Sequence, residues 1–72
     1  MKASPVYRQL ESTMMQEGIN TRALAELLNM SYPALRSRIR GDTDFMLSEA
    51  IEIHSIIGCN MTIEQLFERG KP

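Results

Sequence analysis

The clearest structural pattern in this chain lies in Asn20–Gly41, which reads NTRALAELLNMSYPALRSRIRG. Its apolar residues fall at helical spacing in two groups, and only the short segment Asn29–Ser31 separates them. Such a segment has room for nothing but a tight turn. The pattern therefore predicts two short helices that meet at a corner, one over about Thr21–Leu28 and the other over about Tyr32–Arg40.

The residues at the helix ends agree with this pattern. Asn20 and Ser31 are good N-caps, because their side-chain oxygens can accept a hydrogen bond from a backbone N–H of the first turn. Asn29 tolerates the left-handed conformation that ends a helix, and Pro33 falls in a first turn, where a missing N–H costs nothing. Ala25 is small enough to let the two helices approach closely. Together these features predict a helix-turn-helix.

A first helix is predicted before this motif. Ser4 and Pro5 fit an N-cap and a first helical residue, and the helix should continue to about Glu17. Its buried stripe should contain Val6, Leu10 and Met14. The four glycines each follow a predicted helix, where a residue without Cβ takes positive φ at little cost: Gly18, Gly41, Gly58 and Gly70.

A fourth helix should begin after Ser48 and end at Gly58. Phe45 and Leu47, just before it, are expected to fold under the domain as anchors. The residues that this helix should present to the core are Ala50, Ile53, His54 and Ile57.

The last helix should open at Thr62, because Thr62 and Gln65 have the spacing of a capping box. No segment alternates as a strand does, so the fold class is all-α with five short helices. The 72 residues and the 43% hydrophobic content allow one domain over residues 1–72, with the helix-turn-helix at about 20–40. No apolar run approaches the roughly 20 residues of a membrane span, and the first residues do not form a secretory signal.

The composition offers little for catalysis. Cys59 is the single cysteine, which excludes an internal disulfide framework and favours a reducing cytoplasm. No set of His, Cys or carboxylate residues has the spacing of metal ligands, and Cys59 has no basic partner nearby in sequence. We expect no enzymatic activity, no metal or other cofactor, no small-molecule ligand and no membrane partner.

Charge is distributed unevenly along the chain. The net charge is −1, yet residues 22–40 contain four arginines and a single acid, whereas residues 42–68 contain six acids and no Lys or Arg. Such a distribution is typical of a nucleic-acid-binding face with an acidic far side, although either cluster alone could be ordinary solvated surface.

The motif, together with Ile19, resembles the helix-turn-helix of the Cro and lambda-repressor-like (XRE) family of phage and bacterial transcription regulators. Residues 45–67, FMLSEAIEIHSIIGCNMTIEQLF, resemble the two closing helices of that family, so the resemblance covers roughly residues 18–67. This chain has Asn29 where the family usually has Gly, Thr21 where it often has Gln, and Arg38 at or beside a position that is usually apolar. The resemblance implies a compact five-helix lambda-repressor-like domain and a double-stranded DNA operator as its partner.

The resemblance also implies roles for individual residues. The residues that align with base-contacting positions are Tyr32, Pro33, Arg36 and Ser37. Arg36 is the strongest candidate, because a guanidinium can bond O6 and N7 of guanine at once. The candidates for phosphate contact are Thr21, Arg22, Arg38 and Arg40. Three alternatives stay open: the Tyr32 ring could cover the core edge, Thr21 could serve only to start its helix, and the stem of Arg38 could lie along the core.

Two further expectations follow from the resemblance. The first is a homodimer, at least on DNA, because relatives bind two half-sites; its candidate interface is Met61, Ile63, Leu66 and Phe67, which could instead merely close the domain. The second is the function, a sequence-specific transcription regulator of the Cro/repressor type in the cytoplasm of a bacterial host cell, associated with the nucleoid. The alternative is a protein-binding adaptor or antirepressor that keeps the fold without binding DNA.

Overall fold

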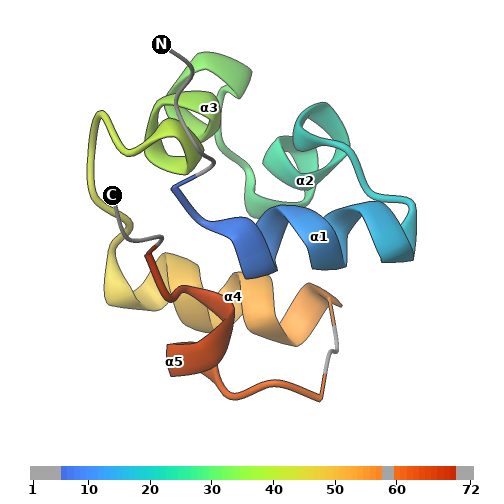
Figure 1. The fold of residues 1–72 in the computed structure, drawn as a ribbon. Coiled ribbons are helices and arrows are strands. Elements are labelled where there is room, and N and C mark those ends of the chain that lie inside the picture. The colour runs from blue at the N-terminus through green and yellow to red at the C-terminus, as the bar shows by residue number, and fades with distance from the viewer. Residues whose placement is uncertain (1–5, 58–59, 70–72) are drawn as a thin grey trace, which may run out of the picture.

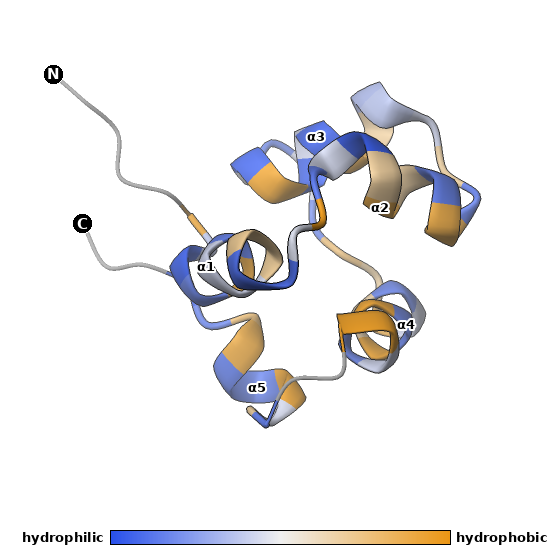
Figure 2. Ribbon diagram, turned by 90° about the vertical axis from the view of Figure 1, so that its right-hand side faces the viewer, coloured by the Kyte–Doolittle hydropathy of each residue, from blue (hydrophilic) through white to orange (hydrophobic). Residues whose placement is uncertain are grey.

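The computed structural model describes residues 6–57 and 60–69. Within these two segments the chain forms five α-helices and no strand, which confirms the all-α class (Figure 1). The helices, in chain order, are α1 (Arg8–Glu17), α2 (Thr21–Leu28), α3 (Tyr32–Arg40), α4 (Leu47–Ile57) and α5 (Ile63–Leu66). In both ribbon views α2 and α3 lie on one side of the molecule and α4 and α5 on the other (Figures 1 and 2). Helix α1 contacts both α4 and α5.

Each helix contributes one fully buried large side chain to a shared core: Leu10, Leu24, Leu35, Ile53 and Leu66. Burying a side chain of this size stabilises the fold by about 1.5 to 3 kcal/mol, so the core depends on every helix being in place. None of the described helices has the length and the apolar content needed to cross a membrane.

The corner between α2 and α3 has the expected boundaries and caps. The Asn20 side chain accepts a hydrogen bond from the backbone N–H of Ala23 at 2.7 Å, and Ser31 Oγ accepts one from Ala34 N at 3.3 Å. Asn29 is left-handed, with φ 59°, and the carbonyl of Ala25 accepts a bond from Met30 N, which closes the end of α2. These short-range contacts end α2 and begin α3 at the corner.

The start of α1 differs from the prediction. The helix begins at Arg8, with Tyr7 at its N-cap, and Ser4 and Pro5 lie outside the described residues. Tyr7 has a non-helical backbone, and its buried ring packs edge-on against Phe45 and Phe67, with ring centroids 5.3 and 6.0 Å away. This aromatic cluster of Tyr7, Phe45 and Phe67 joins three segments distant in sequence, and it confirms Phe45 as an anchor.

The prediction for Leu47 as a second anchor is wrong. Leu47 is the first residue of α4 and is 73% exposed, because Phe45 fills the position beneath the domain. The helix therefore begins before Ser48, and Glu49 Oε1 caps it by accepting a hydrogen bond from Met46 N at 2.9 Å. Four residues of α4 were expected to face the core. His54 is half-buried, and the other three are buried: Ala50, Ile53 and Ile57.

The capping box at the start of α5 is confirmed. Gln65 N donates to Thr62 Oγ1, and Thr62 N donates to Gln65 Oε1, each at 3.1 Å. Gly18 and Gly41 have positive φ as expected, whereas Gly58, Cys59 and Gly70 lie outside the described residues. The box matters because α5 is only four residues long and depends on its cap and on buried Leu66 to stay folded.

Candidate nucleic-acid interface

Helix α3 has one buried face and one solvent-exposed face. Leu35 and Ile39 are buried, and Pro33, Arg36 and Arg40 are exposed on the other side. A helix in the major groove needs such a polar face, held rigidly by the core behind it. The exposed positions are those that the sequence indicated for DNA contact.

Ser37, another candidate for base contact, is less exposed than Arg36. It is half-buried, and its Oγ lies 3.4 Å from the donating Oγ1 of Thr43. Its carbonyl also accepts a bond from Asp42 N at 3.0 Å, where the chain turns after α3. Ser37 therefore takes part in closing the end of α3 as well as lying near its outer face.

Tyr32 lies between two arginines. The guanidinium carbon of Arg22, on α2, is 4.5 Å from the centroid of the Tyr32 ring. One helical turn along α3, Arg36 Nη1 donates a hydrogen bond to the Tyr32 hydroxyl at 3.2 Å. The ring thus crosses the gap between α2 and α3 on the exposed side of the corner, and it is half-buried.

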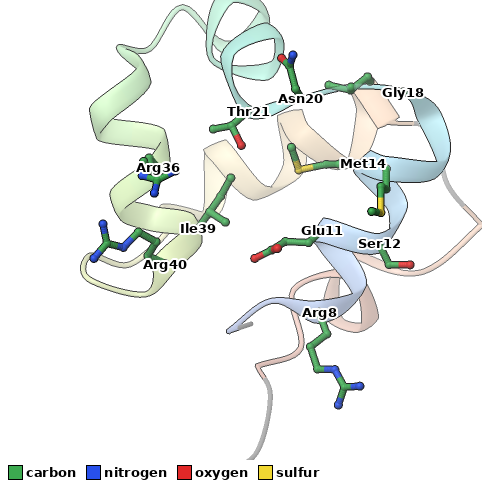
Figure 3. A pocket seen from close by; sticks show the side chains of 12 residues that line it. Arg8, Glu11, Ser12, Met14, Gly18, Asn20, Thr21, Arg36, Ile39 and Arg40 are labelled. Atoms are coloured by element: carbon green, nitrogen blue, oxygen red, sulfur yellow. The ribbon is translucent and has the colours of Figure 1, made fainter. Parts of the chain in front are cut away.

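A groove of about 710 Å³ runs between α1 and α3 and reaches the start of α2. Figure 3 shows α1 and α3 as its two walls, with Glu11 projecting from α1 toward Ile39 and Arg40. Asn20 and Thr21 line the end nearest α2, and the half-buried Thr21 is the first residue of that helix. Helix N-termini favour anions, because their N–H groups and dipole face outward.

Five residues of α1 also line this groove: Arg8, Glu11, Ser12, Met14 and Met15. The two charged ones lie far from the motif in sequence, so no local pattern indicates them. Glu11 projects toward α3, whereas the Arg8 side chain points away from it, so α1 brings a negative charge to the groove (Figure 3).

Arg38, a candidate for phosphate contact, is bound within the domain. Its Nε donates to Glu49 Oε1 at 2.8 Å, and its Nη1 donates to the carbonyl of Ala34 at 3.3 Å. The two charged side chains are only 22% and 16% exposed. Arg38 faces α4, and its guanidinium joins α3 to α4.

Arg40 is held much less firmly. Its Nε lies 3.6 Å from Asp42 Oδ2, and both side chains are more than half exposed. Exposed pairs of this kind contribute from nothing to about 1 kcal/mol, so Arg40 can exchange Asp42 for another anion at small cost. Arg36 and Arg40 are thus the two arginines of α3 that point to solvent.

Two of the four residues predicted for the dimer interface pack within the domain instead. Leu66 is fully buried, and Phe67 packs in the aromatic cluster, so both act in closing the core. Met61 and Ile63 are half-buried. Spacing along a short amphipathic helix does not reveal which of its residues a small core needs, so the sequence alone could not separate Leu66 and Phe67 from an interface.

The exposed apolar residues near α5 come instead from α4. Leu47 and Ile51 are 73% and 48% exposed and lie on the same side of α4 as His54. His54 Nε2 lies 2.6 Å from the carbonyl of Met61, which places that side of α4 toward α5. Figure 2 shows hydrophobic residues over much of α4, whereas α3 is largely hydrophilic. The name α4–α5 apolar surface is used here for exposed Leu47 and Ile51 together with half-buried Met61 and Ile63, of which Met61 also packs against the core.

Among the described residues, no group of three or more His, Cys, Asp or Glu side chains could hold a metal ion. No family model matches the chain, and neither the curated proteins nor the solved structures contain a match to it.

Proposed function

We propose that this protein is a sequence-specific DNA-binding transcription regulator of the Cro/repressor type, with α2 and α3 as a helix-turn-helix of a lambda-repressor-like domain. The observation that carries the proposal is the exposed face of α3. Arg36 and Arg40 point to solvent there, opposite the buried Leu35, on a helix whose start is fixed by a capped corner.

Base contact falls to the first two turns of α3, which enter the major groove in proteins of this architecture. Arg36 would donate two hydrogen bonds to guanine, and Pro33 would contact a neighbouring thymine methyl group. Both side chains are exposed. Ser37 is half-buried and adds at most a single hydrogen bond from the edge of this face.

Phosphate contact falls to both sides of α3. Thr21 and Arg22 at the start of α2 would contact a phosphate of one DNA strand, because the N-terminus of a helix favours an anion. Arg40 at the end of α3 would bind another phosphate. Because affinity for DNA comes largely from counterion release, these contacts supply strength while Arg36 supplies selectivity.

A homodimer on DNA completes the proposal, because one recognition helix buries too little surface to be selective alone. The α4–α5 apolar surface is its proposed contact, with Leu47 and Ile51 taking the place of Leu66 and Phe67. A two-fold contact there would cover aliphatic side chains that face water in the single chain.

The second candidate is a protein-binding adaptor or antirepressor. One observation favours it: Leu27, Met46 and Leu47 are each more than half exposed, and all three lie outside α3. Apolar residues in water are what a protein partner would cover. An adaptor would not need the exposed arginines of α3.

Selection from a random pool of duplex DNA, at low and moderate salt, separates the two candidates. A regulator should enrich a sequence with guanine in each of two half-sites, spaced about 34 Å apart, and should bind more weakly as salt rises. Recovery of the unenriched pool at both salt concentrations would overturn the DNA proposal and favour the adaptor. Enrichment of a single half-site would overturn the dimer alone.

A further inference from the structure

Tyr32 contacts two arginines through different parts of its side chain. The face of its ring lies 4.5 Å from the Arg22 guanidinium carbon, and its hydroxyl accepts a hydrogen bond from Arg36 at 3.2 Å. The contact with Arg36 is an i,i+4 pair within α3, whereas the contact with Arg22 forms only because α2 and α3 pack at the corner. The two arginines come from different helices, so Tyr32 links them across the corner.

Both contacts restrict an arginine without using up its donors. A cation over a ring is attracted by the π face, so the N–H groups at the edge of the Arg22 guanidinium stay available to an anion. The Tyr32 hydroxyl takes one donor from Nη1 of Arg36. In the part of the chain that the structure describes, Nε and Nη2 of Arg36 have no partner, and that edge carries the two parallel donors that O6 and N7 of guanine accept.

Restriction of this kind has a consequence for binding. A long exposed side chain loses rotamer freedom when it is fixed on a ligand, and this loss opposes association. An arginine that is already held in the free protein loses less. Arg40 is the internal contrast, since its contact with Asp42 at 3.6 Å is long and exposed.

We propose that Tyr32 is a positioning residue: its hydroxyl orients Arg36 for guanine, and its ring holds Arg22 for contact with the phosphate backbone. The inference rests on the proposed DNA-binding function. It assigns Tyr32 a role through its neighbours, in addition to any direct contact with a base. The hydroxyl and the ring act on different arginines, so two substitutions separate the roles.

Tyr32→Phe removes the hydroxyl and keeps the ring. Its expected effect is a loss of about three- to tenfold in preference for the selected guanine, because the missing contact is one hydrogen bond at a charged donor. Affinity for a duplex without the selected sequence should stay unchanged. Tyr32→Leu removes the ring as well, and should weaken binding to both duplexes by a further two- to fivefold through Arg22.

The free protein supplies a second, independent measurement. Nitrogen-15 relaxation at Nε reports how ordered an arginine side chain is on the picosecond to nanosecond timescale. Arg36 should be more ordered than Arg40 in the natural protein, and Tyr32→Phe should lower the order at Arg36 alone. Thermal unfolding of Tyr32→Phe checks that the fold is intact, as a half-exposed hydroxyl should permit.

The outcomes are distinct. If the natural protein selects no DNA sequence, the proposed function fails, and this inference fails with it. If the natural protein selects guanine and Arg36→Ala loses that preference while Tyr32→Phe keeps it, the DNA function stands and the positioning role is overturned. Equal order at Arg36 in the natural protein and in Tyr32→Phe would also overturn it.

Discussion

The corner formed by α2 and α3 and the half formed by α4 and α5 have similar cores and opposite surfaces. Each of these four helices buries one large aliphatic residue completely. Outside the core, the corner carries exposed Arg22, Arg36 and Arg40, whereas the other half has exposed acids and the α4–α5 apolar surface. The net charge of −1 therefore describes neither region. The two halves have the same kind of secondary structure and core, so the difference in what each can bind comes from their exposed side chains.

The same contrast exists within α3. Arg36 and Arg38 are two residues apart, yet one points to solvent and the other is bound to Glu49 at 2.8 Å. The two positions differ by more than half a turn of helix, so they face different surroundings. A count of the arginines in α3 would overstate the positive charge of its exposed face, because Arg38 pairs with Glu49 on α4.

The largest expected effect comes from the shared core. Leu35→Ala should lower the free energy of unfolding by about 2 to 5 kcal/mol, because it leaves a cavity at a fully buried position. In a domain of this size that is a large part of the total stability. Urea denaturation measures the loss. The matched control is Leu27→Ala on α2, which is 56% exposed and should cost less than about 1 kcal/mol. Similar losses for both variants would contradict the described packing.

Arg36→Ala should come next, and its effect should fall on DNA binding alone. Affinity for the selected duplex should drop by about 1 to 3 kcal/mol, and selectivity at one base pair per half-site should relax. Fluorescence anisotropy with competing duplexes measures both. Arg36→Lys is the control: it keeps the charge but cannot form the bidentate contact, so it should recover general affinity and not selectivity. Undiminished selectivity in Arg36→Ala would show that α3 does not meet DNA in the proposed orientation.

Arg38→Ala should show the opposite pattern. The partly buried pair with Glu49 lies between an exposed and a fully buried ion pair, and its loss should cost about 1 to 2 kcal/mol of stability. A double-mutant cycle with Glu49→Ala should show that the two losses are not additive. Thermal unfolding is the measurement. If Arg38→Ala leaves stability unchanged and weakens DNA binding instead, the assignment of Arg38 to the α3–α4 contact is wrong.

The smallest expected effect belongs to Arg40. Arg40→Ala should weaken binding to every sequence alike and reduce the slope of log affinity against log salt by about 0.9 per binding site. Titrations at four or more salt concentrations, on selected and unselected duplexes, measure the slope. Stability should not change, because the pair with Asp42 is long and exposed. A change in base preference would place Arg40 at base edges.

Local chemistry explains which features the sequence could predict. Asn20, Asn29 and Ser31 act on backbone groups within five residues, so the bounds of α2 and α3 were predicted correctly. The exposure of Arg36 and Arg40 followed from the spacing of Leu35 and Ile39.

Contacts between distant segments explain the rest. The start of α1 depends on the packing of Tyr7 against Phe45 and Phe67, which no local pattern reveals. Arg38 and Glu49 are eleven residues apart and meet only once α3 and α4 have packed. The buried state of Leu66 likewise depends on how the other helices surround it.

A titration of the nitrogen-15-labelled protein with its selected duplex, followed by amide chemical shifts, compares the two halves of the molecule residue by residue. If α3 enters the major groove, the largest shifts should lie at Tyr32–Arg40 and at Thr21 and Arg22. Any shifts at Leu47 and Ile51 should be smaller and would report the proposed dimer contact. Raising the salt concentration should reverse the shifts. Shifts concentrated on α4 and α5, or none on α3 at saturating DNA, would contradict the proposal that α3 binds DNA.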